Sequence, residues 1–90
     1  PKDGGSFASD NALIWRNAFS ATEHHLYFGS DRTDVTNADK TKREFQGVFL
    51  KDNVYRQKKL EERVYFWRVD AVIGGRLVKG DVWSVEKKGV

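Results

Sequence analysis

The stretch from Val64 to Ala71 constrains the fold of this 90-residue chain more than any other. Apolar side chains occupy every second position of it: Tyr65, Trp67, Val69 and Ala71. The positions between them hold Phe66, Arg68 and Asp70. Successive side chains of a β-strand point to opposite faces, so this alternation predicts a strand whose apolar set lines the core of a sandwich.

Length and composition are those of one soluble globular domain. Ninety residues suffice for a single modest core, so we expect residues 1–90 to form one domain. Apolar residues make up 39% of the chain and aromatic residues 13%, which is typical of neither a disordered segment nor a membrane span. Cysteine is absent, so disulfides and thiolate metal sites are excluded. Because the sequence does not begin with methionine, we expect a piece excised from a longer protein.

Alternation and turn residues predict about seven short strands along the chain. We expect them near Phe7 and over 12–17, 24–28, 44–50, 53–56 and 64–71, with a return over 76–78 that finishes at 81–85. The fourth and fifth form a pair around a turn at Lys51-Asp52, and Gly74-Gly75 makes a hairpin turn. Strands at this spacing are typical of an all-β, immunoglobulin-like sandwich.

One helical turn is expected among these strands. The polar stretch from residue 31 to 42 contains two apolar residues, Val35 and Ala38, three positions apart. That spacing suits a single turn that pins the loop to the core. Asp31 precedes the turn, where an aspartate side chain can cap the first free backbone N–H groups.

A set of fragments in a fixed order carries a family resemblance. They are Leu13-Ile14-Trp15, Leu26 to Asp31, Val35 with Ala38, Tyr55, Leu60, Tyr65 to Asp70 and Gly80 to Ser84. Together they resemble a fibronectin type III domain, of the bacterial kind found beside catalytic and lectin-like domains in secreted polysaccharide-processing proteins. The resemblance implies a seven-stranded β-sandwich. One departure is that the segment from Leu60 to Tyr65 is one residue shorter than in the family, with Glu61-Glu62-Arg63 in place of the customary glycine or threonine.

The large aromatic residues predict how the core is built. Trp15 from one sheet and Trp67 from the other are expected to meet across the interior. Trp83 and Val85 should add to this core from the last strand. Tyr65 should bury its ring and send its hydroxyl to a backbone group near Leu60, because a buried hydroxyl without a partner is destabilising.

A possible binding face lies on the other side of the same strands. Tyr27, Phe66 and Arg68 point away from the proposed core on strands expected to be neighbours, which predicts an exposed aromatic platform with a guanidinium. Sugars and partner proteins both stack on such platforms. The alternative is that Arg68 lies over the two rings and covers them.

Other residues offer little chemistry, and we expect no enzyme activity, metal or cofactor. His24 and His25 are adjacent, so a strand turns them to opposite faces. The carboxylates Glu61-Glu62 lie among basic residues with nothing to form a cleft, and no serine sits in a nucleophile elbow. Two further motifs match poorly or by chance: the acidic loop Asp31, Asp34, Asn37 and Asp39 misses the spacing of a calcium loop, and Lys79-Gly80-Asp81 is an adhesion-like tripeptide.

Charge is uneven along the chain. Residues 1–45 carry six Lys/Arg and seven Asp/Glu, and residues 46–90 carry ten and six. The basic clusters are Lys40, Lys42 and Arg43, then Arg56, Lys58 and Lys59, then Lys87 and Lys88. They suit either contact with polyanions or solvated strand edges.

Three functions follow from these observations. The first is a monomeric, non-catalytic spacer or protein-interaction module in a larger bacterial protein, which the resemblance implies to be secreted, periplasmic or on the cell surface. The second is a carbohydrate-binding accessory domain that uses Tyr27, Phe66 and nearby Phe45 or Phe49. The third is weak polyanion binding by the basic second half. We expect neither nucleic acid binding nor membrane insertion.

Overall fold

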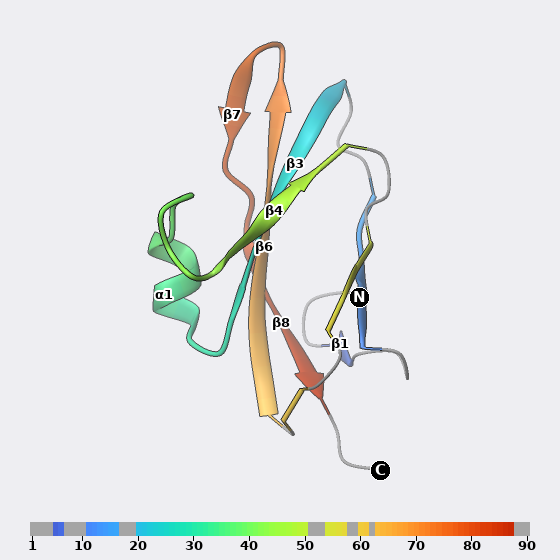
Figure 1. The fold of residues 1–90 in the computed structure, drawn as a ribbon, viewed down its shortest axis with the longest axis vertical. Coiled ribbons are helices and arrows are strands. Elements are labelled where there is room, and N and C mark those ends of the chain that lie inside the picture. Colours follow the sequence, from blue (N-terminus) through green and yellow to red (C-terminus); the bar gives the residue numbers. More distant parts are fainter. Residues whose placement is uncertain are drawn as a thin grey trace.

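Two β-sheets face each other, and a short helix lies on the outside of the larger one (Figure 1). The structure is a computed structural model with extents of 43 × 24 × 21 Å. It describes residues 5–6, 11–16, 20–50, 54–57, 60–61 and 63–87. The expected positions Phe7 and Lys51-Asp52 lie outside the described residues. The mostly β composition and the two sheets confirm the predicted all-β sandwich.

The larger sheet contains six strands. Its order is β1 (Gly5–Ser6), β8 (Val82–Lys87), β6 (Arg63–Ile73), β3 (Ala21–Gly29) and β4 (Phe45–Phe49). A sixth strand, β7 (Arg76–Val78), pairs with the end of β6. Neighbouring strands are antiparallel except β1 and β8, which are parallel. The smaller sheet pairs β2 (Ala12–Ile14) with β5 (Val54–Arg56).

The predicted pairing of the two middle strands is wrong. β4 and β5 belong to different sheets, because β4 pairs with β3 and β5 pairs with β2. Phe49 and Tyr55 instead approach each other across the interior, with ring centroids 6.4 Å apart. The described part of the chain also has eight strands and not seven, since β7 and β8 are separate strands along one edge of β6.

The edge of the larger sheet at β4 is irregular. Its pairing with β3 shifts register between Leu26 and Tyr27. Gly47 lies at this shift with φ of +134°, a conformation that side chains other than glycine rarely adopt. Such a bulge bends the strand and increases its twist.

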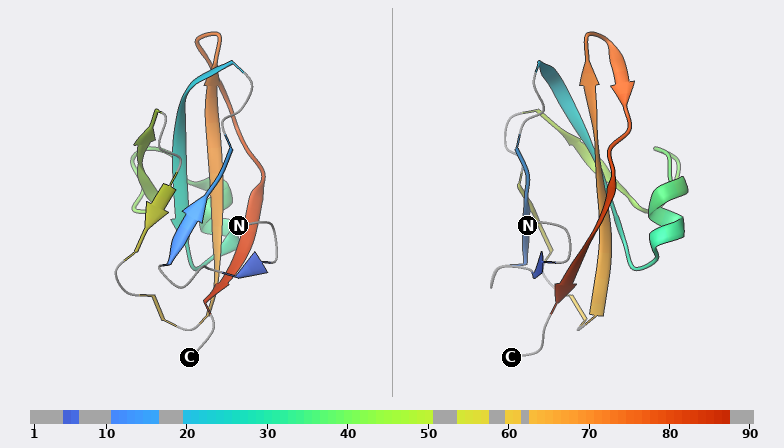
Figure 2. Two further views of the ribbon diagram at one scale, coloured as in Figure 1. Left: turned by 90° about the vertical axis from the view of Figure 1, so that its right-hand side faces the viewer. Right: turned by 180° about the vertical axis from the view of Figure 1, so that it is seen from behind.

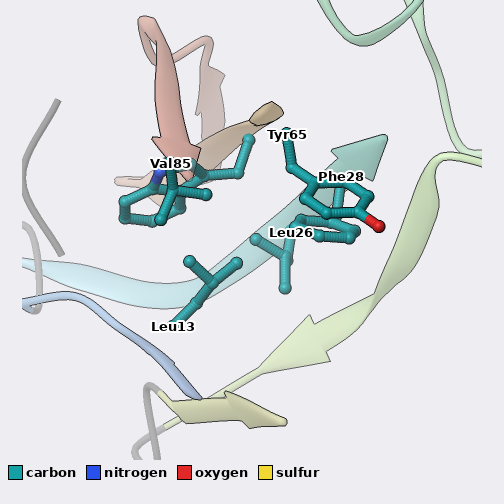
Figure 3. Packing of buried hydrophobic residues seen from close by; sticks show 6 residues of the cluster. Leu13, Leu26, Phe28, Tyr65 and Val85 are labelled. Atoms are coloured by element: carbon teal, nitrogen blue, oxygen red, sulfur yellow. The ribbon is translucent and has the colours of Figure 1, made fainter. Parts of the chain in front are cut away.

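The core fills the space between the sheets (Figure 3). Its buried members are Leu13, Leu26, Phe28, Tyr65, Trp67 and Val85. Trp15 and Trp67 meet as predicted, with ring centroids 6.3 Å apart. Trp83 contacts this core through the Trp67 ring, but 39% of its surface is exposed.

The segment before β6 folds back onto Tyr65 as predicted. The Tyr65 hydroxyl donates to the backbone carbonyl of Glu61 at 3.2 Å, one residue beyond Leu60. Its ring stacks on Phe28, with centroids 5.1 Å apart and an angle of 18° between the planes. The shortened segment therefore still supplies the acceptor that a buried hydroxyl needs.

The helical turn forms where the sequence predicts it. α1 spans Arg32–Asn37, and the Asp31 side chain accepts a hydrogen bond from the backbone N–H of Asp34 at 2.9 Å. Val35 is fully buried, and Ala38 is buried just beyond the helix. Figure 2 shows α1 on the side of the larger sheet away from β2 and β5. The fold thus has three layers in the order small sheet, large sheet, helix.

The hairpin between β6 and β7 also follows the prediction. Gly74 and Gly75 have φ of +59° and +76°, and Ile73 pairs with Arg76 across them. Two successive positive φ angles match the twist of the flanking strands in a two-residue turn.

We predict that Trp67→Ala destabilises the domain by about 3–5 kcal/mol, because it leaves a cavity where Trp15, Trp67 and Trp83 meet. The melting temperature should fall by more than about 10 °C. Ile14→Ala, at a position that is 54% exposed, is the control and should melt close to the parent. An unchanged melting temperature for Trp67→Ala would contradict this description of the core.

Candidate functional site

The three residues of the predicted binding face do lie together. Tyr27 on β3 is the register partner of Arg68 on β6, and Phe66 lies two residues before Arg68 on the same face. The prediction that they are exposed is wrong, however. Tyr27 is 2% exposed and Arg68 is 3% exposed, and Phe66 is half-buried. The physical reason is α1, which packs on this face through Val35.

Arg68 covers the Tyr27 ring, as the alternative interpretation predicts. Its Cζ atom lies 3.9 Å from the ring centroid, which is cation–π geometry. Burial raises the pKa of the Tyr27 phenol, and the nearby Asp70 carboxylate raises it further. The phenol therefore stays neutral at physiological pH under the guanidinium.

Every N–H group of Arg68 has an acceptor. Nε and Nη2 donate to the two carboxylate oxygens of Asp70 at 2.8 and 3.0 Å. Nη1 donates to the carbonyls of Val35 and Thr36 at 2.7 and 2.9 Å, and Nη2 donates to the carbonyl of Ala38 at 3.0 Å. A guanidinium has five donors, so this arrangement uses all of them within the protein.

These contacts satisfy the end of α1. The last carbonyls of a helix have no partner inside the helix and carry its partial negative charge, so a cation there is stabilising. Lys79 adds to Arg68 by donating to the Thr36 carbonyl at 2.6 Å. Arg68 on β6 and Lys79, the residue after β7, thus hold one end of the helix.

Asp70 connects this cluster to the junction between β7 and β8. One of its oxygens also accepts the backbone N–H of Gly80 at 3.0 Å. Gly80 passes so close to β6 that a Cβ atom there would meet the backbone oxygen of Val69 at an overlapping distance of 2.1 Å. We call Arg68, Asp70 and Gly80 with their acceptors on α1 the helix clamp.

The remaining aromatic residues of the predicted site also pack against other side chains of the protein. The Arg32 guanidinium lies over the Phe66 ring, 4.8 Å from its centroid. Phe45 packs beside Tyr27 at 5.4 Å and is half-buried. Phe49 belongs to the opposite face and packs in the core against Trp15. Binding of a ligand to Tyr27 and Phe66 stays a prediction, and it would require α1 to move.

The acidic loop and the histidines have local partners. Hydrogen bonds from Thr41 lower the pKa of the Asp39 carboxyl, and Asp31 is the cap of α1. His24 and His25 are both buried, and His25 Nε2 lies 2.7 Å from Glu23 Oε1. Over the described ranges, no three His, Asp or Glu side chains gather closely enough to hold a metal ion.

The charged motifs are spread over the molecule. Lys40, Lys42 and Arg43 are exposed after α1, and Lys87 at the end of β8 donates to the Asn11 side chain at 2.6 Å. Glu61 is exposed, whereas Lys58, Lys59, Glu62 and Lys88 lie outside the described residues. In the adhesion-like tripeptide, Lys79 donates to the Thr36 carbonyl of α1 and Gly80 lies against β6, so two of its three residues have contacts within the fold.

The sequence carries a signal for the clamp. Arg68 and Asp70 are two residues apart on one strand, so they share a face and have opposite charge. Arginine and aspartate are rarely buried unless they are paired. The contribution of Gly80 has no comparable signal in the sequence, because it depends on how closely the β7–β8 junction approaches β6.

The part of the chain that the structure describes contains no helix long and apolar enough to cross a membrane. Comparison of the chain with known protein families, with curated proteins and with solved structures gave no match.

We predict that Arg68→Ala destabilises the domain by about 3–5 kcal/mol, because it leaves the Asp70 carboxylate buried without its counter-ion. The double variant Arg68→Met with Asp70→Leu should recover a large part of this loss, since it removes both charges and keeps the volume. Urea denaturation of the parent, Arg68→Met, Asp70→Leu and the double variant measures the coupling. Additive losses would show that the two side chains do not act as a pair.

We predict that Gly80→Ala costs about 1–3 kcal/mol, because its Cβ would displace the β7–β8 junction from Val69. Amide hydrogen exchange should then accelerate in α1 as well as in β8, since Asp70 links the two. Leu77→Ala, at a position of β7 that is 51% exposed, is the control and should leave α1 protected. A fully protected α1 in Gly80→Ala would argue against the link.

Proposed function

We propose that this chain is a non-catalytic, fibronectin type III-like module that spaces and orients neighbouring domains in a larger secreted or cell-surface bacterial protein. The observation that carries the proposal is the helix clamp. The most elaborate polar cluster of the described residues satisfies its donors with acceptors of the chain itself. These hydrogen bonds hold α1 on the larger sheet and leave a ligand few polar groups to bind.

The strand arrangement supports the finer assignment of the fold. A pair of strands, β2 and β5, packs against a sheet in which β8, β6, β3 and β4 are consecutive neighbours. Tyr65 near the start of β6 donates to a backbone carbonyl four residues upstream, a contact similar to the tyrosine corner of immunoglobulin-like sandwiches. The family resemblance of the sequence points the same way. Function inferred from fold rests on analogy, so it needs a direct test.

The dimensions suit a spacer. The long axis is 43 Å, about twice either of the other two. Such a module separates whatever is joined to it by a fixed distance if its interior is rigid. The buried aromatic core and the hydrogen bonds of the clamp support such rigidity.

The carbohydrate-binding alternative at Tyr27 and Phe66 has no structural observation in its favour. Its two best groups, Tyr27 and Arg68, are buried and in contact with each other. Phe66 is covered by Arg32. We therefore do not carry this face forward as a second function.

A replacement experiment tests the spacer function in the parent protein. Residues 5–87 are exchanged for an unrelated β-sandwich with a long axis near 43 Å, and in a second variant they are deleted. We expect the exchange to leave the maximum dimension in small-angle X-ray scattering and the activity of the neighbouring domains unchanged, and the deletion to alter both. Loss of activity on exchange would reject a pure spacer and indicate a specific surface on this module.

A further inference from the structure

Part of the outer face of the larger sheet lies beyond α1. The helix packs on this face through Val35, against Tyr27 and its neighbours. Figure 2 shows the β6–β7 hairpin and the start of β3 extending past the helix. Outer side chains on these strand ends are therefore not covered by α1.

Strand register identifies these side chains. Val72 on β6 pairs with Glu23 on β3 and with Leu77 on β7, so the three side chains share a face. Glu23 and Tyr27 lie on the same strand at an even spacing, which keeps side chains on one face. Glu23, Val72 and Leu77 therefore lie on the outer face of the sheet.

Strand β4 contributes one more apolar side chain to this face. Val48 is the register partner of His25, and the Glu23 carboxylate contacts the His25 ring from the next outer position of β3. Val48 and Glu23 are thus diagonal neighbours, about 7–8 Å apart and within reach of a long side chain. Four side chains from four adjacent strands form a continuous row, which we call the outer stripe: Val48, Glu23, Val72 and Leu77.

The outer stripe is apolar where a solvated sheet is usually polar. An antiparallel sheet with one face in water alternates apolar residues inside with polar residues outside. Here Val48 is 47% exposed, Leu77 is 51% exposed and Val72 is half-buried. Valine suits a strand because it is β-branched, but leucine is not, so strand propensity does not account for Leu77. Exposed apolar side chains that are gathered on one face indicate an interaction site.

The charge within the stripe restricts the partner. The Glu23 side chain is 35% exposed, and its Oε1 atom lies 2.7 Å from His25 Nε2. In a two-fold pairing of stripes from two copies of the chain, the two Glu23 carboxylates would lie close together and repel each other. A lysine or arginine between apolar side chains complements the stripe instead.

The spacing of the stripe matches an α-helix. Neighbouring strands of a sheet lie about 4.8 Å apart, and successive turns of an α-helix lie about 5.4 Å apart. A helix laid across the strands therefore meets each of the four positions with one residue per turn, at i, i+4, i+7 and i+11. Alternate residues of an extended segment are about 6.8 Å apart and lose the match sooner. α1 already shows that this face accepts a helix through an apolar side chain.

We propose that the outer stripe is a docking site for an amphipathic helix of a partner protein, with a lysine or arginine on Glu23 and apolar residues on Val48, Val72 and Leu77. Four side chains are far fewer than the about 20–30 residues that each side of a stable protein interface contributes, so the complex is a weak one. This site goes beyond the spacer function, since a spacer needs no partner of this kind.

The test titrates the ¹⁵N-labelled chain with designed peptides and follows the backbone amides by NMR. The probe is a capped helical peptide of about 16 residues, with leucine at i, lysine at i+4, and leucine at i+7 and i+11 on an alanine and glutamine background. We expect saturable shifts at residues 23, 48, 72 and 77, with the amides of β2 nearly still. A peptide of the same composition in scrambled order, and one with glutamate in place of lysine, should bind at least about tenfold more weakly.

Variants of the chain separate docking from folding. Leu77→Ser removes an exposed apolar side chain and should weaken binding of the lysine peptide by about tenfold. Glu23→Gln removes the charge, so the lysine and glutamate peptides should then bind alike. Ile14→Ser, at a 54% exposed position of the smaller sheet, is the matched control and should bind like the parent. Melting curves establish that each variant is folded.

Three results would overturn the proposal. They are a flat response to the lysine peptide, equal affinity for it in the folded Leu77→Ser variant, and a concentration-dependent dimer of the chain that Leu77→Ser abolishes, which would assign the stripe to a second copy. None of them affects the spacer function, which the replacement in the parent protein tests independently.

Discussion

The ion pair of Arg68 and Asp70 determines where the outer layer of the molecule lies. α1 has six residues, far fewer than an isolated helix needs to be stable in water. Burial of Val35 supplies free energy, but a hydrophobic contact has no preferred direction. The guanidinium does have one, since its N–H groups meet a carboxylate on β6 and three carbonyls at the end of the helix. Directional contacts of this kind select one placement of the helix.

The same pair accounts for the absence of an aromatic platform. Arg68 can satisfy its donors with backbone carbonyls only if α1 lies across the sheet, and then α1 also covers Tyr27. Asp70 extends the effect to the last strand through Gly80. One charged pair thus joins the helix, β6 and the β7–β8 junction, at a desolvation cost that its hydrogen bonds must offset.

Features that depend on neighbours in sequence were predictable. The alternation of β6, the Gly74-Gly75 turn and the Asp31 cap each follow from local geometry, and the structure contains all three. Contacts between strands that are distant in sequence were less predictable. The period of a strand shows which side chains share a face, but it does not show which strand lies beside it, so β4 and β5 were paired wrongly.

Prediction of the candidate sites lacked the same information, namely which elements lie beside each strand. Alternation placed Tyr27, Phe66 and Arg68 on one face correctly, but it carries no information about what covers that face. It also placed Trp83 toward the core, and the side chain does point there. The period of the strand does not show that 39% of the Trp83 surface stays exposed.

The irregular β4 strand has a consequence for behaviour in concentrated solution. A flat edge strand can pair with the edge of another molecule and start aggregation. Val48, one of the residues on β4, is apolar and exposed, so a regular strand there would be adhesive. The register shift and the backbone of Gly47 bend this edge. A strand of another molecule therefore finds no straight row of hydrogen-bond partners along it. A residue with no side chain thereby makes this edge a poorer template for an added strand.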